Sequence, residues 1–458
     1  MNKAAFSVYK DKLVLVVGLA KSGSAVAKLL FRLGASVIVN DRNAREECAG
    51  IEELENLGIQ VVCGSHPLEL LDRPIDLIVK NPGIPFDIPF LAEAEQRGIS
   101  VITEVEIASC ISEAPIIGIT GSNGKTTTTT MIHLMLQGGK YNPLIAGNIG
   151  TVMCEVTEQA TNEDIIVAEL SSFQLLGTAS FRPKIGLLLN IHEAHLNYHH
   201  TMEHYTSAKL KLFANQDPTD LAVLNADQDF IRQAAAHLQA EVAWFSTEQE
   251  VHRGSFIRHE GIIYRDGQGD EIEILPLSEL LLPGRHNVQN ALAAITVSLA
   301  AGAELTRVQE VLKTFRGVEH RLKFVATKAG VHYYNDSKAT NATATINSIQ
   351  AFQNPLLLIA GGLDRGEDLS PLEPILTSHV KTLIAYGQLA PELKKAAQSA
   401  GLKQVYMADT VEDAVNTASL LAQQGDTVLL SPAAASWDQF RSFEERGDMF
   451  IRSVHKLK

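Results

Sequence analysis

The chain has 458 residues, which is enough for about three domains. Hydrophobic residues make up 45% of it and charged residues 20%, so large cores can be buried and extensive disorder is excluded. The formal net charge of -14 argues against nucleic acid or an anionic membrane as the main partner. Small anions are not excluded as ligands, because they respond to the local field and not to the total charge.

The cysteine pattern and the apolar stretches of the sequence both indicate in which cellular compartment the protein is found. The chain has four scattered cysteines without a C-x-x-C pair, namely Cys48, Cys63, Cys110 and Cys154. This pattern predicts reduced thiols in a cytoplasmic protein, and not a disulfide or zinc framework. The apolar run 13–20 is short and enters a glycine-rich turn, so it predicts a buried first strand and not a signal peptide. No apolar stretch approaches the ~20 residues of a membrane span.

The first segment, residues 1–103, opens with a βαβ pattern. An apolar strand from residue 13 enters a turn that contains Gly18, Ala20 and Gly23. An amphipathic helix then leads to a second strand, which ends in Asp41. The pattern resembles a dinucleotide-binding fingerprint in which alanine replaces the second glycine. It predicts a diphosphate-binding turn and leaves a dinucleotide and another diphosphate open as the ligand.

The second segment, residues 104–317, contains a phosphate-binding pattern, 118-GITGSNGKTTTTT-130. A strand, a glycine turn and a helix N-terminus in this order point backbone N–H groups and the helix dipole at an anion. Lys125 can neutralise phosphate charge, and the Thr126 hydroxyl can ligate Mg²⁺. The usual loop has a glycine where this chain has Ile119, so the pattern departs from the GTPase and motor form. An ordinary glycine turn is the alternative.

Two further stretches of this segment carry candidate ligands. The strand 165–169 ends in Glu169, which we expect to bind Mg²⁺ beside the loop, although a lone strand-end glutamate is more often solvated or capping. The stretch 190-NIHEAHLNYHH-200 holds four histidines. H-E-A-H is one residue short of the zinc motif H-E-x-x-H, so a zinc site is only weakly indicated and a polar loop is the alternative.

Strands and helices alternate along the rest of the chain. Further strands are expected in 75–85, 185–191, 221–227, 331–337, 355–362, 381–387 and 426–432, with a polar hairpin in 255–275 and a helix in 287–302. This alternation predicts an α/β fold with mostly parallel sheets and ligands at the carboxyl ends of the strands. In the third segment, residues 318–458, the polar stretches 335-NDSKATN-341 and 431-SPAAASWDQF-440 follow two strands and predict a binding site.

Taken together, these motifs resemble the ATP-dependent Mur ligases, relatives of folylpolyglutamate synthetase. The shared elements are TGSNGKTT at 120–127, GNIG at 147–150, HN with a second Asn at 286–290 and HR at 320–321. AELSSFQL at 168–175, NDSKATN and SPAAASWDQF resemble the member that adds D-glutamate to UDP-N-acetylmuramoyl-L-alanine. The resemblance implies ATP-dependent amide bond formation through an acyl phosphate, in the synthesis of peptidoglycan precursors.

The resemblance also implies a fold of three domains. These are a Rossmann-like domain for the UDP-substrate (1–103), a central P-loop-type ATPase domain (104–317) and a Rossmann-like domain for the amino acid (318–458). UDP-substrate contacts are implied for Gly18, Ser22, Gly23, Asp41, Arg42, Asn81, Gly83, Ser171 and Gln174. ATP contacts are implied for Gly121, Ser122, Asn123, Gly124, Lys125, Thr126, Thr127, Asn148, Asn287, Asn290, Arg321 and Asp336. D-glutamate contacts are implied for Lys338, Thr340, Arg365, Ser436 and Phe443.

The catalytic group implied by the resemblance is Lys125, Glu169, His195 and Lys209. Two Mg²⁺ ions are implied, held by Thr126, Glu169, His195 and a Lys209 carbamylated by CO₂. Sequence alone predicts an ordinary surface position on a helix for Lys209. The chain departs from many relatives at Ala194, where they carry an acid, and at Arg365, where some carry a lysine.

Other functions stay open at this stage. A sibling Mur ligase or folylpolyglutamate synthetase would share the ATP site and differ in the first domain and in NDSKATN. An NAD-dependent oxidoreductase would use the first βαβ unit, but it would leave the phosphate loop unexplained. A nucleotide-gated binding protein would have no chemistry. We expect a cytoplasmic monomer that binds neither nucleic acid nor membranes.

Overall fold

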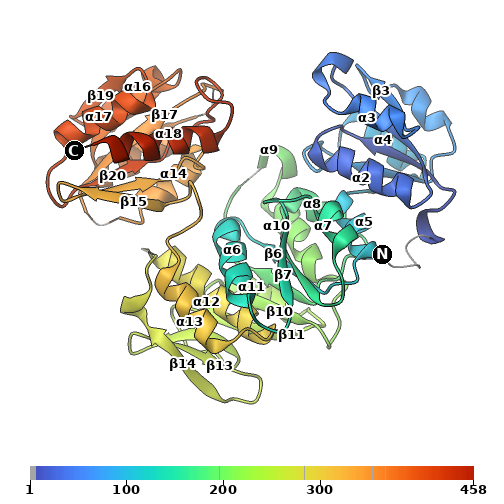
Figure 1. Cartoon of the computed structure of the whole chain (residues 1–458), viewed down its shortest axis with the longest axis horizontal. Coiled ribbons are helices and arrows are strands. Elements are labelled where there is room, and N and C mark those ends of the chain that lie inside the picture. The colour runs from blue at the N-terminus through green and yellow to red at the C-terminus, as the bar shows by residue number, and fades with distance from the viewer. Residues whose placement is uncertain (1–6, 195, 283, 353, 367, 458) are drawn as a thin grey trace. The chain divides into compact units, whose positions relative to one another are not determined.

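The structure is a computed structural model that describes residues 7–194, 196–282, 284–352, 354–366 and 368–457. It contains three sheets, of five, nine and six strands (Figure 1). The chain divides into two compact units. The first runs to Glu279 and includes Gln289–Lys313, and the second consists of Leu280–Val288 and the chain from Thr314 onward. The domain boundaries at 103/104 and 317/318 stay predictions.

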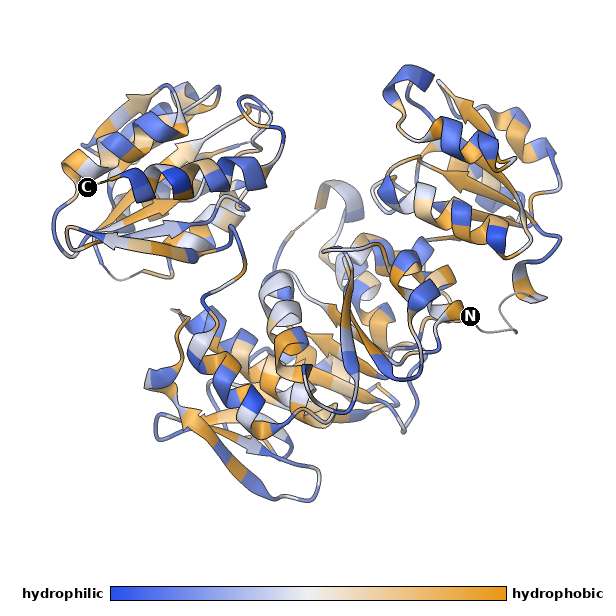
Figure 2. Cartoon of the chain, viewed as in Figure 1, coloured by the Kyte–Doolittle hydropathy of each residue, from blue (hydrophilic) through white to orange (hydrophobic). Residues whose placement is uncertain are grey.

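The first sheet is parallel throughout and has the strand order β3-β2-β1-β4-β5. Its strands are β1 (Leu13–Val17), β2 (Ser36–Asp41), β3 (Gln60–Cys63), β4 (Leu77–Lys80) and β5 (Val101–Ile102). The helices around it are α2 (Lys21–Arg32), α3 (Ile51–Asn56), α4 (Pro89–Gln96) and the 3₁₀ turns η1 (Arg45–Glu47) and η2 (Leu68–Asp72). β1 is apolar along its whole length, as is typical of a parallel sheet with helices on both faces. In Figure 2 the strands of this domain are mostly hydrophobic, whereas its helices also carry hydrophilic residues.

The functional edge of this sheet follows from its strand order. The connection reverses at β1, whose neighbours are β2 and β4. The carboxyl ends of β1 and β4 therefore lie side by side, and the N–H of Asn81 donates to the carbonyl of Val17 at 2.7 Å. A switch point of this kind is where open α/β sheets bind their ligands. It brings together the turn after β1 and the turn after β4.

The second sheet has the order β14-β13-β12-β11-β10-β9-β6-β8-β7. Its strands are β6 (Ile116–Thr120), β7 (Asn142–Gly147), β8 (Asp164–Glu169), β9 (Ile185–Leu188), β10 (Leu221–Asn225), β11 (Glu241–Ser246), β12 (Gly254–Arg258), β13 (Gly261–Arg265) and β14 (Glu271–Pro276). The strands from β7 to β12 pair in parallel. β12, β13 and β14 pair in antiparallel, which confirms the predicted hairpin.

Helices precede and cover this sheet. They are α5 (Glu104–Ile111), α6 (Lys125–Leu136), α7 (Met153–Gln159), α8 (Ser172–Leu176), α9 (Leu196–His199), α10 (Met202–Leu210), α11 (Asp229–Ala235), α12 (Arg285–Ala300) and α13 (Leu305–Thr314), with the short turns η3 (Lys211–Phe213) and η4 (Leu277–Glu279). α5 packs on α2 and α7 and so joins the first two domains in one unit. The expected helix at 287–302 is α12.

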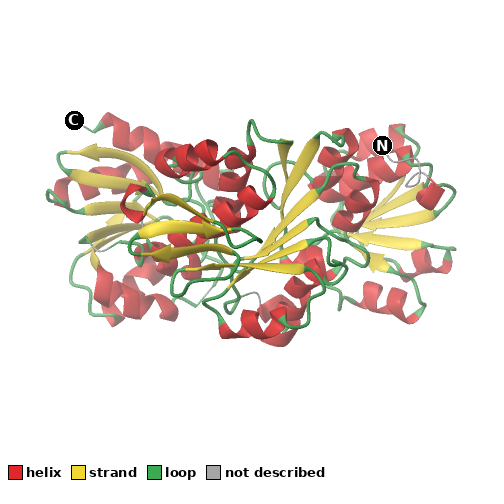
Figure 3. Cartoon of the chain, turned by 90° about the horizontal axis from the view of Figure 1, so that it is seen from below, coloured by secondary structure: helices red, strands yellow, loops and turns green. Residues whose placement is uncertain are grey.

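The third sheet has the order β15-β16-β20-β17-β18-β19, and only its β15–β16 pair is antiparallel. Its strands are β15 (Lys323–Lys328), β16 (Val331–Asn335), β17 (Leu356–Gly361), β18 (Val380–Tyr386), β19 (Val405–Ala408) and β20 (Thr427–Leu430). Its helices are α14 (Ala342–Ile349), α15 (Glu373–His379), α16 (Ala390–Ser399), α17 (Val411–Leu421), α18 (Phe443–Lys456) and the turn η5 (Ser370–Leu372). Figure 3 shows strands between layers of helices.

The predicted α/β class with mostly parallel sheets is confirmed. The four cysteines are free thiols. Among the described residues, no helix is long and apolar enough to cross a membrane.

Candidate active site

The predicted phosphate loop lies between β6 and α6. Two of its glycines have backbone conformations that other residues rarely adopt, with φ of 153° at Gly121 and 83° at Gly124. A Cβ atom at Gly124 would collide with the Oδ1 atom of Asn290 on α12. At Gly121 a Cβ would lie 2.9 Å from the Cβ of Leu189. The loop therefore needs glycine at both positions, and an ordinary flexible turn does not.

The loop is fixed by the segment that follows β9. Asn123 donates its backbone N–H to the Asn190 Oδ1 atom at 2.9 Å, and the N–H of Ser122 donates to the Asn190 carbonyl at 2.9 Å. The Ser122 and Tyr205 hydroxyls lie 2.8 Å apart. These contacts hold the loop rigid while α6 begins at Lys125, where the first N–H groups of a helix have no intrahelical acceptor. The arrangement suits an anion at the start of α6.

Lys125 lies over the loop that precedes it. Its Nζ atom donates to the carbonyls of Gly121 at 2.7 Å and Ser122 at 2.9 Å. Thr126 and Thr127 follow it and are buried in the first turn of α6. The positive charge of Lys125 therefore lies beside the N-terminus of α6, where the two can together neutralise phosphate oxygens.

Glu169 is the last residue of β8, which pairs in parallel with β6. It is opposite Ile119, just before the phosphate loop begins. Its side chain is 1% exposed. The Oε1 atom accepts from the side-chain amide of Asn148 at 2.8 Å. The Oε2 atom is buried and has no hydrogen-bond partner among the residues that the structure describes. A buried carboxylate oxygen without a donor is costly, and a bound hard cation such as Mg²⁺ would satisfy it.

Lys209, on α10, contradicts the surface position predicted from sequence alone. The side chain is 1% exposed, and its Nζ atom donates to the Gly121 carbonyl at 2.8 Å. Burial lowers the pKa of the Lys209 amine well below its ordinary value, and the charge of Lys125 lowers it further against the opposing effect of Glu169. Lys209 lies four residues after Tyr205, which is also buried, so the two side chains lie on the same face of α10.

The histidine cluster is only partly described. His195 lies outside the described residues, so its assignment as a metal ligand stays a prediction. His199 is buried, and its Nε2 atom lies 2.9 Å from the Ser172 hydroxyl. Across the described part of the chain, no three histidine, cysteine, aspartate or glutamate side chains gather as a metal site. The weakly indicated zinc site therefore gains no support.

The candidate UDP-substrate residues of the first domain gather at the switch point. Asp41 accepts from the N–H of Leu19 at 2.6 Å and so ties the end of β2 to the glycine turn. Asn81 donates to the Ser22 hydroxyl at 3.0 Å and accepts from the N–H of Gly83 at 3.1 Å. The polar groups of the two turns are therefore already oriented toward each other.

The other residues predicted to bind the UDP-substrate differ in burial and in the contacts that they make. Gly23 lies in the first turn of α2, where a Cβ atom would collide with the carbonyl of Gly18. Arg42 is exposed. Ser171 and Gln174 bond each other as the capping box of α8, with the Ser171 N–H donating to Gln174 Oε1 at 2.9 Å. The structure therefore gives these last two a local role in starting a helix.

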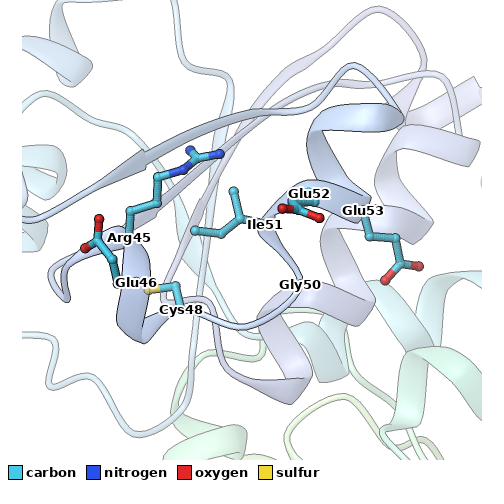
Figure 4. Close-up of a pocket in the computed structure, with 7 residues that line it drawn as sticks. All are labelled: Arg45, Glu46, Cys48, Gly50, Ile51, Glu52 and Glu53. Carbon is cyan, nitrogen blue, oxygen red and sulfur yellow. The ribbon is translucent and has the colours of Figure 1, made fainter.

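A hollow of about 520 Å³ opens next to α3 (Figure 4). It is lined by Arg45, Glu46, Cys48, Gly50, Ile51, Glu52 and Glu53. Burial, helped by the charge of Asp41, raises the pKa of the Cys48 thiol to about 11. The thiol is therefore protonated at neutral pH and is a poor nucleophile.

In the second unit, the NDSKATN turn carries the buried carboxylate of Asp336, which residues outside the turn surround. Its oxygens accept from the N–H of Leu322 at 3.1 Å and from the hydroxyls of Ser348 at 2.6 Å and Ser431 at 2.8 Å. Burial raises the pKa of Asp336 to about 6, although these donors and the charge of Arg321 oppose the change. The turn is therefore rigid at its centre.

The candidate D-glutamate residues lie around this turn. Lys338 places its Nζ atom 5.5 Å from the ring centre of Phe443 at the start of α18. Ser436 is buried and Thr340 half-buried. Arg365 is exposed and stacks its guanidinium 4.7 Å from the Trp437 ring. Asn287, the remaining ATP candidate of this unit, is buried.

Sequence reasoning missed two buried cations. Arg446 is fully buried, and its guanidinium donates to the hydroxyl of Ser337 at 2.9 Å and to its carbonyl at 2.8 Å. These hydrogen bonds fix Ser337 and so stabilise the NDSKATN turn. Lys80, at the end of β4, is 1% exposed. Neither belongs to a motif with a known chemical signature, so charge and spacing alone would have assigned both to the surface.

Comparisons with known proteins agree with this arrangement. Family models match in chain order: the Mur ligase MurD-like N-terminal domain at residues 12–103, the Mur ligase middle domain at 119–298 and the Mur ligase glutamate ligase domain at 320–434. The chain is 50% identical over 459 residues to UDP-N-acetylmuramoylalanine--D-glutamate ligase of Geobacillus sp. (strain WCH70), covering 100% of both proteins. It is 49% identical to the Bacillus subtilis (strain 168) protein of the same name, over 97% of each.

Solved structures show the same fold. The MurF ligase of Thermotoga maritima in complex with ADP matches with a TM-score of 0.58 at 16% identity, covering 100% of both chains. A pseudomurein peptide ligase type C from Methanothermus fervidus matches with a TM-score of 0.56 at 18% identity, covering 97% of this chain and 100% of that one. The expected three-domain fold is confirmed, and the chain belongs to the Mur ligase family, in its MurD-like branch.

Proposed function

We propose that this protein joins D-glutamate to UDP-N-acetylmuramoyl-L-alanine while ATP is converted to ADP and phosphate, a step of peptidoglycan precursor synthesis. The observation that carries the proposal is the placement of three groups at one phosphate loop: Lys125 and Lys209 donate to the carbonyl of Gly121, and Glu169 pairs with Ile119 on the strand that leads into the loop. The full-length identity to ligases named for this reaction supports the choice of substrates. The motifs NDSKATN and SPAAASWDQF support it independently.

The chemistry proceeds through an activated carboxylate. An oxygen of the alanyl carboxylate attacks the γ-phosphorus of ATP, and ADP leaves. The resulting acyl phosphate has a good leaving group, which the free carboxylate lacks. The neutral amine of D-glutamate then attacks the carbonyl carbon and loses a proton, and the tetrahedral intermediate expels phosphate to leave the amide. Most of the rate enhancement in such a sequence comes from positioning and charge neutralisation.

Lys125 and the start of α6 are proposed to hold the β- and γ-phosphates. The Nζ atom would exchange its two loop carbonyls for phosphate oxygens, and its charge would follow the phosphoryl group as the bond to ADP breaks. Asn148 fixes Glu169 through a hydrogen bond, and we assign it to the same phosphate. Asn290 on α12 borders the loop at Gly124, and we assign it with Asn287, Arg321 and Asp336 to the rest of ATP.

Two Mg²⁺ ions are proposed to bind at Thr126, Glu169, His195 and a carbamylated Lys209. The unsatisfied Oε2 atom of Glu169 fits such a cation. When bound, Mg²⁺ would neutralise the ATP phosphates and the acceptor carboxylate, which otherwise repel each other. Lys209 is buried without an ion-paired carboxylate in the described structure, which favours its neutral amine. That amine can attack CO₂ and lose a proton, so that a lysine becomes an anionic oxygen ligand.

The two remaining sites are assigned to the two substrates. Gly18, Ser22, Gly23, Asp41, Arg42, Asn81 and Gly83, with Ser171 and Gln174, are proposed to bind the uridine nucleotide. Lys338, Thr340, Arg365, Ser436 and Phe443 are proposed to bind D-glutamate, whose two carboxylates need cationic and hydroxyl donors. The cytoplasmic location and the monomeric state stay predictions.

The experiment is ADP release from ATP with UDP-N-acetylmuramoyl-L-alanine and one amino acid at a time. D-glutamate should stimulate release strongly. L-alanine, L-lysine and meso-diaminopimelate should leave it at the background level. Stimulation by one of these instead of D-glutamate would indicate a sibling ligase, and no stimulation by any amino acid would refute the proposal.

A further inference from the structure

Lys80 is the last residue of β4, and its side chain contacts the backbone of the loop that follows. Its Nζ atom donates to the carbonyl of Ile84 at 2.7 Å and lies 3.3 Å from that of Pro82 and 3.4 Å from that of Asn81. It also lies 4.2 Å from the ring centre of Phe86. The loop 81–86 therefore wraps around one ammonium group.

Tyr198 approaches the same carbonyls from the second domain. It belongs to α9, the short helix that begins directly after position 195. Its hydroxyl accepts from Lys80 Nζ at 3.2 Å and points its own proton toward the carbonyls of Ile84, at 3.1 Å, and Pro82, at 3.3 Å. Both contacts lie within one compact unit. The loop after β4 is thus held jointly by a cation of its own domain and a phenol of the next.

The contacts continue on both sides of this pair. Toward the first domain, Asn81 bonds the Ser22 hydroxyl of the glycine turn. Toward the second, the ring centre of Tyr198 lies 4.4 Å from that of Phe173 on α8. Phe173 stacks on His199, which bonds Ser172 just beyond the end of β8. A continuous set of packed groups thus connects the glycine turn with the strand end that carries Glu169.

Stability alone does not account for a charge at this position. No carboxylate of the described residues pairs with Lys80, and burial lowers the pKa of its amine to about 7. An apolar side chain of similar length would fill the space without that desolvation cost. What the Lys80 amine supplies in either protonation state, and an apolar group cannot, is a set of N–H donors that orients several loop carbonyls at once.

We propose that Lys80 and Tyr198 act together as positioning residues that hold the loop 81–84 on α9, so that the uridine nucleotide bound at this loop is presented in a fixed position to the ATP centre. This inference rests on the function proposed above and names a determinant of substrate binding within it. Asn81 and Gly83, the loop's candidate substrate contacts, are displaced when either member of the pair is lost.

The test is a double-mutant cycle on Lys80→Met and Tyr198→Phe in the full-length enzyme. Each single change should raise the KM for UDP-N-acetylmuramoyl-L-alanine by about tenfold, the scale of one hydrogen bond to a charged group. The double variant should raise it by far less than the ~100-fold product, because each change already releases the loop. The KM for ATP should be unchanged. Lys28→Met, which removes a half-buried lysine on α2 paired with Glu53 at 2.7 Å, is the control outside the loop and should leave both KM values as in wild type.

Other results would overturn the inference. Additive effects in the double variant, or an equal rise in the KM for ATP, would show general damage and not a shared task at the loop. Tyr198→Phe preserves the ring, so it decides the matter if Lys80→Met does not fold. Calorimetric titration with UDP separates the two proposals, because it needs no ligase activity. Weaker UDP binding in Tyr198→Phe would support the pair even if no amide were formed, and unchanged UDP binding would reject it.

Discussion

Glu104→Gln should make the protein more stable at neutral pH. Glu104 opens α5, is buried and accepts from the N–H of Cys154 at 3.2 Å, at the start of α7. Burial raises the pKa of its carboxyl from 4.5 to about 7, although the donors from α7 oppose the change. The folded protein therefore holds a proton that the unfolded chain loses well below neutral pH.

The direction and the size of the effect on stability follow from this difference in proton binding. Between pH 4.5 and 7 the folded state binds more protons than the unfolded state, so stability falls as the pH rises, and above pH 7 the loss is complete. At about 1.4 kcal/mol per pKa unit, the full loss is about 3 kcal/mol. Glutamine keeps an acceptor for Cys154 and carries no charge, so the variant should not show this loss. For a unit of this size, we expect a Tm about 5 °C above wild type at pH 8.

The assay is thermal unfolding of both proteins at intervals from pH 4.5 to 8.5. The advantage of the variant should be largest at pH 8 and vanish near pH 4.5. Glu106→Gln is the matched control on the same helix, where the carboxylate accepts from the N–H groups of Ala179, Ser180 and Phe181 at 2.8–3.1 Å. It should be less stable than wild type at pH 8. A Glu104→Gln variant that is less stable than wild type at pH 8, or whose advantage does not depend on pH, would show that the Glu104 carboxyl does not lower stability at neutral pH.

Three further predictions concern the phosphate loop. Lys125→Ala should lower ATP-dependent turnover at least ~100-fold with the fold intact by circular dichroism, and near-normal turnover would remove Lys125 from the mechanism. Lys209→Ala should be inactive and regain activity with added short-chain carboxylates, whereas no rescue would argue against a carbamate. Gly124→Ala should lose at least ~10-fold more activity than Gly138→Ala, since both glycines have φ near 80° but only Gly124 has Asn290 against the new methyl group. Equal losses would show that backbone strain alone is responsible.

The sequence predicted the central strands and the phosphate loop because their signals are local. β1, β6 and β8 are continuous apolar runs, and the turn after β6 shows its glycines directly. The strands β5, β7 and β19 were not predicted, because they lie at the edges of their sheets and carry few buried side chains.

Buried lysine and arginine side chains were the second kind of feature that could not be predicted from the sequence. Lys80, Lys209 and Arg446 are fully buried, yet a lysine or arginine on a strand or helix is normally a surface residue. Their burial depends on neighbours distant in sequence, such as Tyr198 for Lys80 and Ser337 for Arg446. For Lys209 only the family resemblance indicated a special role.

The most direct test of the central claim is the product itself. The purified protein is incubated with ATP, Mg²⁺, UDP-N-acetylmuramoyl-L-alanine and D-glutamate, and the mixture is analysed by mass spectrometry together with ADP and phosphate. We expect a product heavier than the UDP-substrate by one glutamate residue, formed in equal amount to ADP and absent when D-glutamate is replaced by L-glutamate. ATP hydrolysis without this product, or an equal yield with L-glutamate, would contradict this expectation.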